Sequence, residues 1–199
     1  MKLVRNSKRP LEYNLQGEGV KRLFFILLLL LSASLYCEIT VMSPKFKNGD
    51  YIDCRYTCDG EDVSPPISWT AGPKNTKSYV LILDDPDASR GTWVHWVLYN
   101  IPADTLELKY KFGRVGKVKL HREIKQGKNS FERFDYGGPC PPSGTHRYFF
   151  KVFAIDRMLR FPLKTMVDAN TIMKAIEEHI LAKGQIMFRY KRKPCPKKK

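Results

Sequence analysis

The chain has 199 residues, enough for one domain of ordinary size and too few for two unless both are small. Hydrophobic residues make up 43% and charged residues 28%, a globular composition that excludes a disordered chain and a polytopic membrane protein. The formal net charge is +15, but residues 1–37 and 191–199 supply ten of these charges. Because the basic residues gather at the ends and no recognition motif is present, we expect no nucleic-acid partner.

An apolar segment lies near the N-terminus. Residues Leu23–Cys37 (LFFILLLLLSASLYC) follow two basic residues and end in small ones, which is the pattern of a signal peptide. A bilayer-spanning helix needs about 20 apolar residues, so this run is short for a permanent anchor. Ser32 and Ser34 suit an ordinary signal peptidase, whereas Cys37 invites lipidation, against which Tyr36 argues by its size.

Several fates of this segment therefore remain open: cleavage, lipidation at Cys37, retention, packing as a core helix, or a translation start downstream of Met1. We predict a leader at residues 1–37, with its targeting segment at 21–37, a domain at 38–191 and a basic flexible tail at 192–199. The leader predicts a protein that is exported or membrane-associated, in the periplasm or cell envelope if the source is bacterial.

The five cysteines are an odd number and do not define a disulfide framework. Cys54 and Cys58 lie in a strand-like stretch, where a rise of about 3.3 Å per residue would separate their Cα atoms by roughly 13 Å, too far to bridge. A zinc site at this pair would need a second close pair, which Cys140 and Cys195 do not form. We therefore expect structural thiols, no metal and no other cofactor.

The first half of the domain favours short strands, because proline and glycine turns interrupt it repeatedly. Ser78–Leu83 (SYVLIL) is a near-continuous apolar run, as in a strand covered on both faces. Trp93–Ile101 (WVHWVLYNI) alternates and places His95 on the same face as Val97. Residues 103–135 are charged and aperiodic, so we expect long exposed connections there, with at most one short turn of helix and no functional residue.

The second half predicts one more strong strand, one helix and a last strand. Tyr148–Ile155 forms the strand, with His146, Tyr148 and Phe150 on one face. The spacing of Ile172, Ile176 and Ile180 predicts a helix over Ala169–Ala182, which Asp168 caps and Gly184 ends. Gln185–Lys191 reads as the last strand.

Three polar features in the middle of the chain lie where strands meet loops. They are the acidic turn Asp84–Asp87, His95, and a Gly/Pro loop that leads into His146 and Tyr148. Two imidazoles and a phenol can donate hydrogen bonds to an anion, and the two glycines of the loop could expose backbone N–H groups to it. Asp85 would repel an anion unless it orients a histidine or meets the cationic part of a zwitterionic ligand. The combination predicts a small pocket that suits phosphoethanolamine-like head groups.

Seven motifs accompany this constellation: Thr57-Cys58-Asp59-Gly60, Ser64-Pro65-Pro66 with Trp69, Asp85-Pro86-Asp87-Ala88, His95-Trp96, Asn100-Ile101-Pro102, Tyr136-Gly137-Gly138-Pro139-Cys140-Pro141-Pro142, and Gly144-Thr145-His146-Arg147-Tyr148. Their types and order resemble the phosphatidylethanolamine-binding, Raf-kinase-inhibitor-like family, especially its bacterial branch. The resemblance covers about residues 39–190.

The resemblance implies a mainly β fold, an antiparallel β-sandwich with peripheral helices and one C-terminal helix, and a surface pocket for phosphate-like anions. It assigns no catalytic or metal residue. The ligand-binding residues that it implies are Asp85, His95, Tyr136, Gly138, Pro142, His146 and Tyr148. Two features depart from the family pattern. Ser89 stands where the family commonly has a proline, which would loosen the pocket wall, and the leader is not a usual part of the domain.

The function that we expect is a non-enzymatic binding module for phosphate-like or phosphoethanolamine-type anions, through which it could modulate a protein partner. One alternative is a hydrolase that uses His146 or His95 as general base, with a nucleophile or metal that the sequence does not reveal. Another is an inert interaction scaffold. The Lys/Arg tail suits either an anionic membrane surface, at about 1 kcal/mol per basic residue near the bilayer, or a solubilising end.

Overall fold

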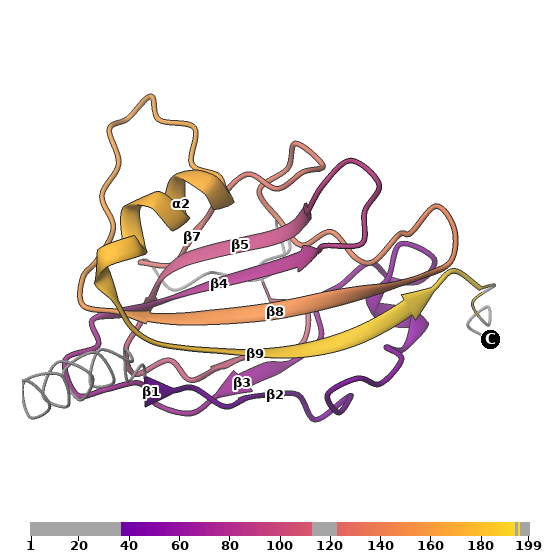
Figure 1. Ribbon diagram of the computed structural model, residues 1–199, viewed down its shortest axis with the longest axis horizontal. Coiled ribbons are helices and arrows are strands. Elements are labelled where there is room, and N and C mark those ends of the chain that lie inside the picture. The colour runs from indigo at the N-terminus through magenta and orange to yellow at the C-terminus, as the bar shows by residue number, and fades with distance from the viewer. Residues whose placement is uncertain (1–36, 113–122, 194, 196–199) are drawn as a thin grey trace, which may run out of the picture. The chain divides into compact units, whose positions relative to one another are not determined.

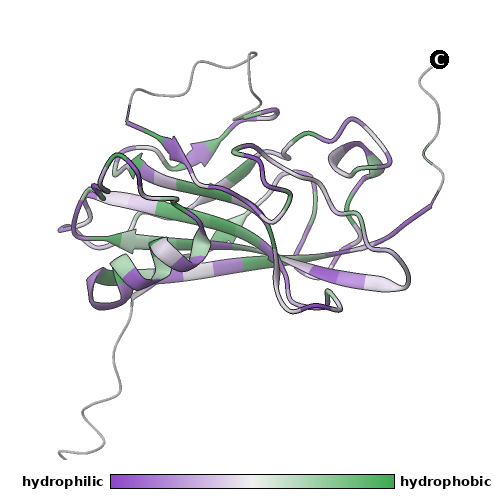
Figure 2. Ribbon diagram, turned by 90° about the horizontal axis from the view of Figure 1, so that it is seen from above, coloured by the Kyte–Doolittle hydropathy of each residue, from purple (hydrophilic) through white to green (hydrophobic). Residues whose placement is uncertain are grey.

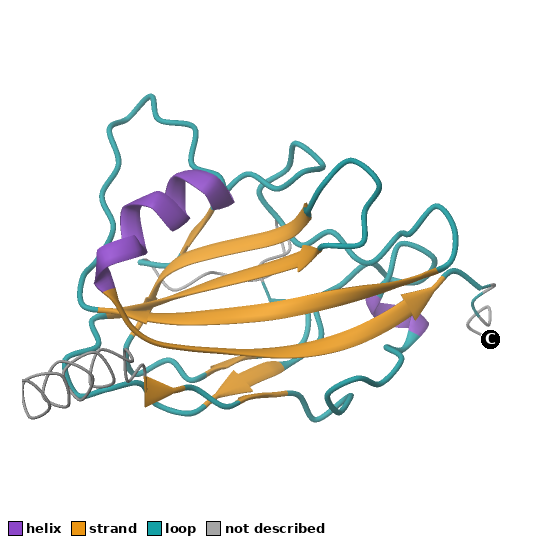
Figure 3. Ribbon diagram, in the orientation of Figure 1, coloured by secondary structure: helices purple, strands orange, loops and turns teal. Residues whose placement is uncertain are grey.

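The structure is a computed structural model that describes residues 37–112, 123–193 and 195. Its strands form a six-stranded sheet, in the order β1-β9-β8-β4-β5-β7, and a three-stranded sheet, in the order β2-β3-β6 (Figure 1). The strands are β1 (Cys37–Glu38), β2 (Val41–Met42), β3 (Ile67–Trp69), β4 (Ser78–Asp85), β5 (Trp93–Pro102), β6 (Glu107–Leu108), β7 (Lys125–Gln126), β8 (Thr145–Ile155) and β9 (Ile180–Lys191). The helices are α2 (Ala169–Ile176) and the short 3₁₀ turns η1 (Cys54–Tyr56) and η2 (Glu177–His179) (Figure 3).

The described domain has three layers, because each face of the large sheet has its own core. One hydrophobic cluster joins Leu81, Leu98 and Phe150 of the large sheet to Ile67 and Trp69 of the small one. A second cluster lies between the other face of the large sheet and α2. In Figure 2 the strands of the large sheet carry most of the hydrophobic colour. The predicted antiparallel β-sandwich with one C-terminal helix is confirmed, with β1 paired parallel to β9 as the exception.

Strand β4 is the centre of the large sheet and lies between β5 and β8. Leu81 and Leu83 belong to the core between the sheets, whereas Val80 and Ile82 belong to the core under α2. Each such side chain contributes about 1.5 to 3 kcal/mol by leaving water. The prediction of a strand covered on both faces is confirmed, and the strand continues to Asp85.

The C-terminal helix is shorter than predicted. It begins at Ala169, where the Asp168 carboxylate accepts a hydrogen bond from the Thr171 backbone, but α2 ends at Ile176 and β9 begins at Ile180. Residues that the periodicity placed in the helix instead pair with β8. Gly184 therefore does not end a helix: it lies within β9, where a Cβ atom would overlap the backbone carbonyl of Ile39.

Within the described ranges, no helix is long and apolar enough to cross a membrane. The predicted leader lies outside these ranges except for Cys37, which begins β1. The predicted tail begins at Arg192, yet this residue is held to the domain, because its guanidinium donates to the Asp59 carboxylate at 2.7 and 3.0 Å.

Candidate anion pocket

A small pocket lies at one end of the large sheet, where β4 ends and β5 and β8 begin. Its volume is about 230 Å³. Antiparallel pairing places Asp85 opposite Trp93 on β5, and the preceding residue Asp84 opposite Phe149 on β8. The residues that line it are Asp85, Ala88, Ser89, Arg90, Trp93, His95, Phe131, Cys140, Pro141, Pro142 and His146.

A β-bulge places His95 in this pocket. Leu83 pairs with Trp96 and the next residue, Asp84, pairs with Val94, so His95 is an extra residue in β5. Bulges of this kind redirect a side chain and are frequent beside functional sites. Val97 packs in the core under α2, whereas the His95 ring contacts Tyr148 in the core between the sheets. The prediction that His95 shares a face with Val97 is therefore wrong, because it assumed regular alternation.

The His95 ring is held on three sides. Its Nδ1 lies 2.7 Å from the carbonyl oxygen of Gly137, which can only accept, so Nδ1 carries the proton and Nε2 remains for a ligand. The rings of Phe131 and Tyr148 meet it edge to face, each at 5.2 Å between centroids. Burial lowers the pKa of His95 below the ordinary value of 6.5, although the Gly137 carbonyl and Asp85 oppose this shift. The neutral ring therefore dominates at neutral pH.

Asp85 orients the second histidine. One carboxylate oxygen lies 2.7 Å from Nδ1 of His146, and the other accepts the backbone N–H of Asp87 at 2.9 Å. Both groups of the pair are nearly buried, with side-chain exposures of 4% for Asp85 and 11% for His146. Of the two roles that the sequence left open for Asp85, the geometry favours holding the ring, which leaves Nε2 of His146 for a ligand.

The acidic turn divides its carboxylates among three environments. Asp84 lies 2.6 Å from Nζ of Lys151, and burial raises its pKa. Asp85 belongs to the pocket. Asp87 accepts hydrogen bonds from the Arg147 guanidinium at 2.6 and 2.9 Å. These bonds are the main reason why the pKa of Asp87 falls to about 2. The Asp87–Arg147 pair therefore holds the turn against the start of β8. Its contribution to stability is complete above the ordinary pKa of 3.8 and is lost as the pH falls through about 2.

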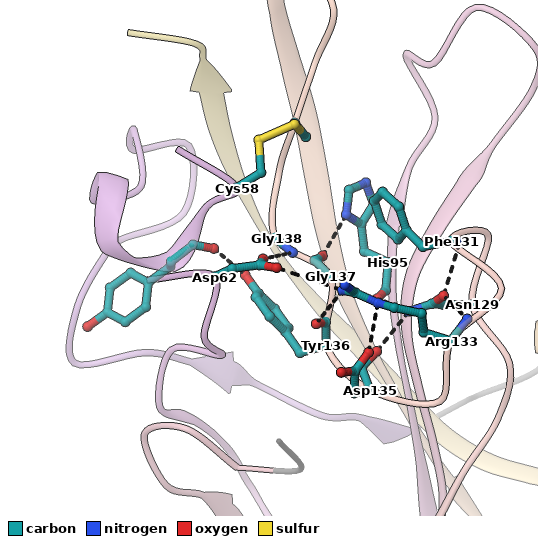
Figure 4. Close-up of polar contacts among 12 residues, drawn as sticks. Cys58, Asp62, His95, Asn129, Phe131, Arg133, Asp135, Tyr136, Gly137 and Gly138 are labelled. Carbon is teal, nitrogen blue, oxygen red and sulfur yellow. Dashed lines mark hydrogen bonds and ion pairs between the residues drawn. A yellow bond between two sulfur atoms is a disulfide. The ribbon is translucent and has the colours of Figure 1, made fainter. Parts of the chain in front are cut away.

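The loop around Asn129, for which no function was predicted, contributes Phe131 to the pocket. Figure 4 shows the polar contacts of this loop. Asn129, 3% exposed, donates to the backbone carbonyls of His95 and Asp135 and accepts from the backbone N–H groups of Phe131 and Arg133. This network presents the Phe131 ring to His95. The expectation of long exposed connections over residues 103–135 is therefore wrong for this part, and the segment also contains β6 and β7. Residues 113–122 lie outside the described ranges.

The Gly/Pro loop packs against the domain and does not offer its N–H groups to the pocket. The Gly137 N–H donates to the His95 carbonyl, and the Gly138 N–H donates to Asp62 at 2.6 Å. A Cβ atom at Gly138 would lie 2.7 Å from both the Asp62 carboxylate and the Tyr56 carbonyl. The predicted exposure of these N–H groups is wrong, because close packing occupies them.

Of the seven ligand-binding residues implied by the sequence, four line the pocket: Asp85, His95, Pro142 and His146. The other three lie behind it. Tyr136 is buried and donates its hydroxyl to the Tyr56 carbonyl at 2.7 Å, and burial raises its pKa well above 10.0. Gly138 packs as described, and Tyr148 lies beneath the two histidines, its ring stacked on that of His146. Sequence reasoning missed Arg90, Trp93 and Phe131, although the position of Arg90 just after the acidic turn was a usable signal.

Two disulfides replace the expected free thiols. Cys58 is bonded to Cys140, with 5.5 Å between their Cα atoms, and Cys54 is bonded to Cys195. The first ties the pocket wall to the segment after η1, and the second ties the C-terminal residues to η1 itself. Sequence spacing excluded only a Cys54–Cys58 bond, and these pairings agree with that exclusion. Among the described residues, no group of three metal-ligand side chains is assembled.

The Tyr148 hydroxyl is fully buried and no described group meets it with full hydrogen-bond geometry. Burial raises its pKa most, followed by Asp85, which acts through its charge and as a poorly aligned acceptor. An unpaired buried hydroxyl is costly, so Tyr148→Phe should leave the stability of the ligand-free protein unchanged or raise it by about 1 kcal/mol. Denaturant unfolding measures this change. A loss of more than about 1 kcal/mol would show that the hydroxyl has a partner in solution. Tyr190→Phe is the control, because its hydroxyl donates to Asp59 at 2.9 Å and its removal should destabilise.

Comparisons with known proteins identify the relatives of this chain. Residues 42–191 match the family model for phosphatidylethanolamine-binding protein. The chain is 49% identical over 154 residues to a UPF0098 protein of Aquifex aeolicus, covering 76% of this chain and 88% of that protein. A UPF0098 protein of Methanothermobacter thermautotrophicus is 42% identical over 147 residues, which cover 74% and 95% of the two chains.

Two solved structures share the fold. Escherichia coli YbcL, described as a member of the mammalian phosphatidylethanolamine-binding family, has a TM-score of 0.72 and 31% identity, with 79% of this chain and 100% of that one covered. A phosphatidylethanolamine-binding protein homologue from Chlamydia trachomatis has a TM-score of 0.70 and 30% identity, with 78% and 99% covered. The chain belongs to the phosphatidylethanolamine-binding protein family.

Proposed function

We propose that the pocket binds phosphate-like anions, including phosphoethanolamine-type head groups, as a non-enzymatic recognition site. The observation that carries this proposal is the pair of oriented histidines. Nδ1 of His146 is engaged by Asp85 and Nδ1 of His95 by the Gly137 carbonyl, so each ring has only Nε2 left for a ligand. At that atom a neutral ring accepts from a hydroxyl or ammonium group of the ligand, and a protonated ring donates to an anion. Arg90 lines the same pocket.

The size of the pocket supports a small ligand group. Sites for drug-sized molecules measure about 300 to 1,000 Å³, and this pocket of about 230 Å³ is smaller. A phosphate ester or a head group fits this scale, with the rest of a larger ligand outside. Trp93, 36% exposed, and the Phe131 ring offer apolar contact at the wall.

Binding is favoured over hydrolysis by the state of the reactive groups. Both oxygens of Asp85 accept hydrogen bonds, and the cysteine in the lining, Cys140, is in a disulfide. Ser89 also lines the pocket, and it makes no hydrogen bond to either histidine within the described chain. A nucleophile activated by a neighbouring base is thus missing from the described lining.

We also propose that this binding takes place outside the cytoplasm or at a membrane. The apolar leader predicts export. The two disulfides support that prediction, because such bonds persist mainly in oxidising compartments.

Calorimetric titration of sulfate and phosphoethanolamine at about pH 8 and about pH 5.5 tests the pocket. Because burial lowers the pKa of His95, its imidazolium forms only below 6.5, where it becomes a charged donor. Sulfate keeps its charge over this range, so its tighter binding at low pH would report on the protein. The same pKa makes the ligand-free fold less stable as pH falls through 6.5, since the unfolded state takes up the proton more readily.

Arg90→Ala should weaken sulfate binding about fivefold, as expected for an exposed cation worth about 1 kcal/mol. Arg157→Ala, at the other end of β8, is the matched control and should bind normally. If sulfate bound equally at both pH values and in both variants, the anion would lie elsewhere and the proposal would fail.

A further inference from the structure

The loop that joins β8 to α2, residues 156–168, projects from the large sheet (Figure 1). It presents apolar side chains to solvent. Leu163 is fully exposed, and Met166 and Met158 are 55% and 36% exposed. A turn closed by the hydrogen bond from the Thr165 N–H to the Pro162 carbonyl places Leu163 at the tip. Exposed apolar side chains that gather on one projection mark an interaction site more often than scattered ones do.

The base of this loop is fixed by the fold. Asn100 has a positive φ of 57° and lies at a second bulge of β5, where Tyr79 pairs with Ile101 and Leu81 with Leu98. Its side chain donates to the Leu159 carbonyl at 2.9 Å and accepts from the Leu159 N–H at 2.7 Å. Asn100 belongs to one of the family-like motifs, and it has no role in the pocket. The hydrogen bonds of Asn100 therefore fix the position of the loop below its tip.

Two further contacts hold the loop, one before its tip and one after it. The Phe161 ring contacts Tyr99 at 5.7 Å, and the Val167 carbonyl accepts from the Lys128 N–H at 2.7 Å. Between these anchors the exposed residues remain on the outside.

Two cations flank the apolar tip. Arg160 and Lys164 are exposed, and neither forms an ion pair within the described part of the chain. The acidic residues at the two ends of the loop have other partners: Asp156 pairs with Arg157 and His179, and Asp168 accepts the Thr171 backbone N–H at the start of α2. An apolar tip between cations matches the interface of an anionic bilayer, where apolar side chains enter the acyl boundary and cations remain at the phosphates.

The loop lies at the end of the sheet where β1 begins. Ala154, next to the end of β8, pairs with Ala182, and Ala182 also pairs with Cys37 at the start of β1. In the sequence the apolar run ends at this point. His146, by contrast, lies at the opposite end of β8.

We propose that residues 158–166 dock this domain on an anionic membrane surface, with Leu163 and Met166 inserted and Arg160 and Lys164 at the head groups. The anion pocket lies at the opposite end of β8, so in this orientation it takes a free phosphate ester and not a head group of the same bilayer. A protein partner is a weaker fit, because stable protein interfaces bury about 800 Å² on each side and this tip is one narrow turn.

Tryptophan fluorescence of the protein as isolated tests the proposal. Leu163→Trp is mixed with vesicles of phosphatidylglycerol whose acyl chains carry bromine, which quenches inserted tryptophan. We expect quenching beyond that of the parent protein. Met42→Trp is the matched control, because Met42 is 44% exposed on the other sheet and should stay unquenched.

The charge is tested in the Leu163→Trp background. Lys164→Glu should raise the lipid concentration needed for half-maximal quenching at least about fivefold, since each basic residue near the surface contributes about 1 kcal/mol. Lys191→Glu reverses a charge at the C-terminal end of β9 and should leave this lipid concentration unchanged. Absence of added quenching in Leu163→Trp, or equal quenching in Met42→Trp, overturns the proposal, and a partner protein would then be the occupant to seek.

Discussion

Replacing His146 with alanine should weaken binding of phosphate and sulfate about ten- to a hundredfold, because a charge-assisted hydrogen bond is worth roughly 1.5 to 3 kcal/mol. Titration calorimetry of the variant beside the parent protein measures this loss. His179→Ala is the matched control, since His179 pairs with Asp156 at the far end of β8.

The same substitution leaves Asp85 without its ring partner in a nearly buried position. An unpaired buried carboxylate destabilises the fold, so thermal unfolding must be measured on the same samples. The combination of Asp85→Asn with His146→Ala removes the unpaired carboxylate as well as the ring and should recover stability while affinity stays low. Recovery of affinity in this double variant would contradict a direct contact between His146 and the anion.

Much of the fold follows from local patterns in the sequence. The run Ser78–Leu83 places apolar side chains on both faces of a strand, which is typical of a strand in the middle of a sheet. β4 occupies that position. The alternation of His146, Tyr148 and Phe150 holds in β8, because this strand pairs with β9 in regular register from Thr145 to Ala154. Where a strand is regular, its faces can be predicted.

The candidate site depends on departures from that regularity. A period of two cannot reveal the bulge that turns His95, because the signal is a change of partner on β4 and not a residue type. The hydrogen bonds of Asn129 are equally hidden, since this residue acts through the carbonyls of His95 and Asp135, which the fold brings near. Phe131 could be assigned to the pocket only once these segments had been placed, whereas Arg90 follows the acidic turn directly in the sequence.

Each of the two bulges of β5 positions a side chain at a different end of the sheet. The first delivers His95 to the pocket, and the second delivers Asn100 to the loop that carries Leu163. One strand therefore positions two polar side chains whose targets lie at opposite ends. This arrangement explains how recognition of an anion and docking to a surface could proceed on one small domain without competition.

Removing the Cys58–Cys140 disulfide should lower both stability and anion affinity. Bonds that close long loops contribute about 2 to 4 kcal/mol, mainly by restricting the unfolded chain. Cys140 also lines the pocket beside Pro141 and Pro142, so its release frees one wall. The double variant Cys58→Ser/Cys140→Ser should unfold at a lower denaturant concentration and bind sulfate several-fold more weakly.

The other disulfide is the control for this prediction. Cys54→Ser/Cys195→Ser opens a bond of sequence separation 141, against 82 for Cys58–Cys140, and the chain-entropy contribution changes only slightly with length. Both double variants should therefore lose a comparable amount of stability in denaturant titrations. Neither Cys54 nor Cys195 lines the pocket, so this variant should keep its sulfate affinity. Equal loss of affinity in the two double variants would mean that the Cys58–Cys140 bond supports the whole domain and has no particular effect on the pocket wall.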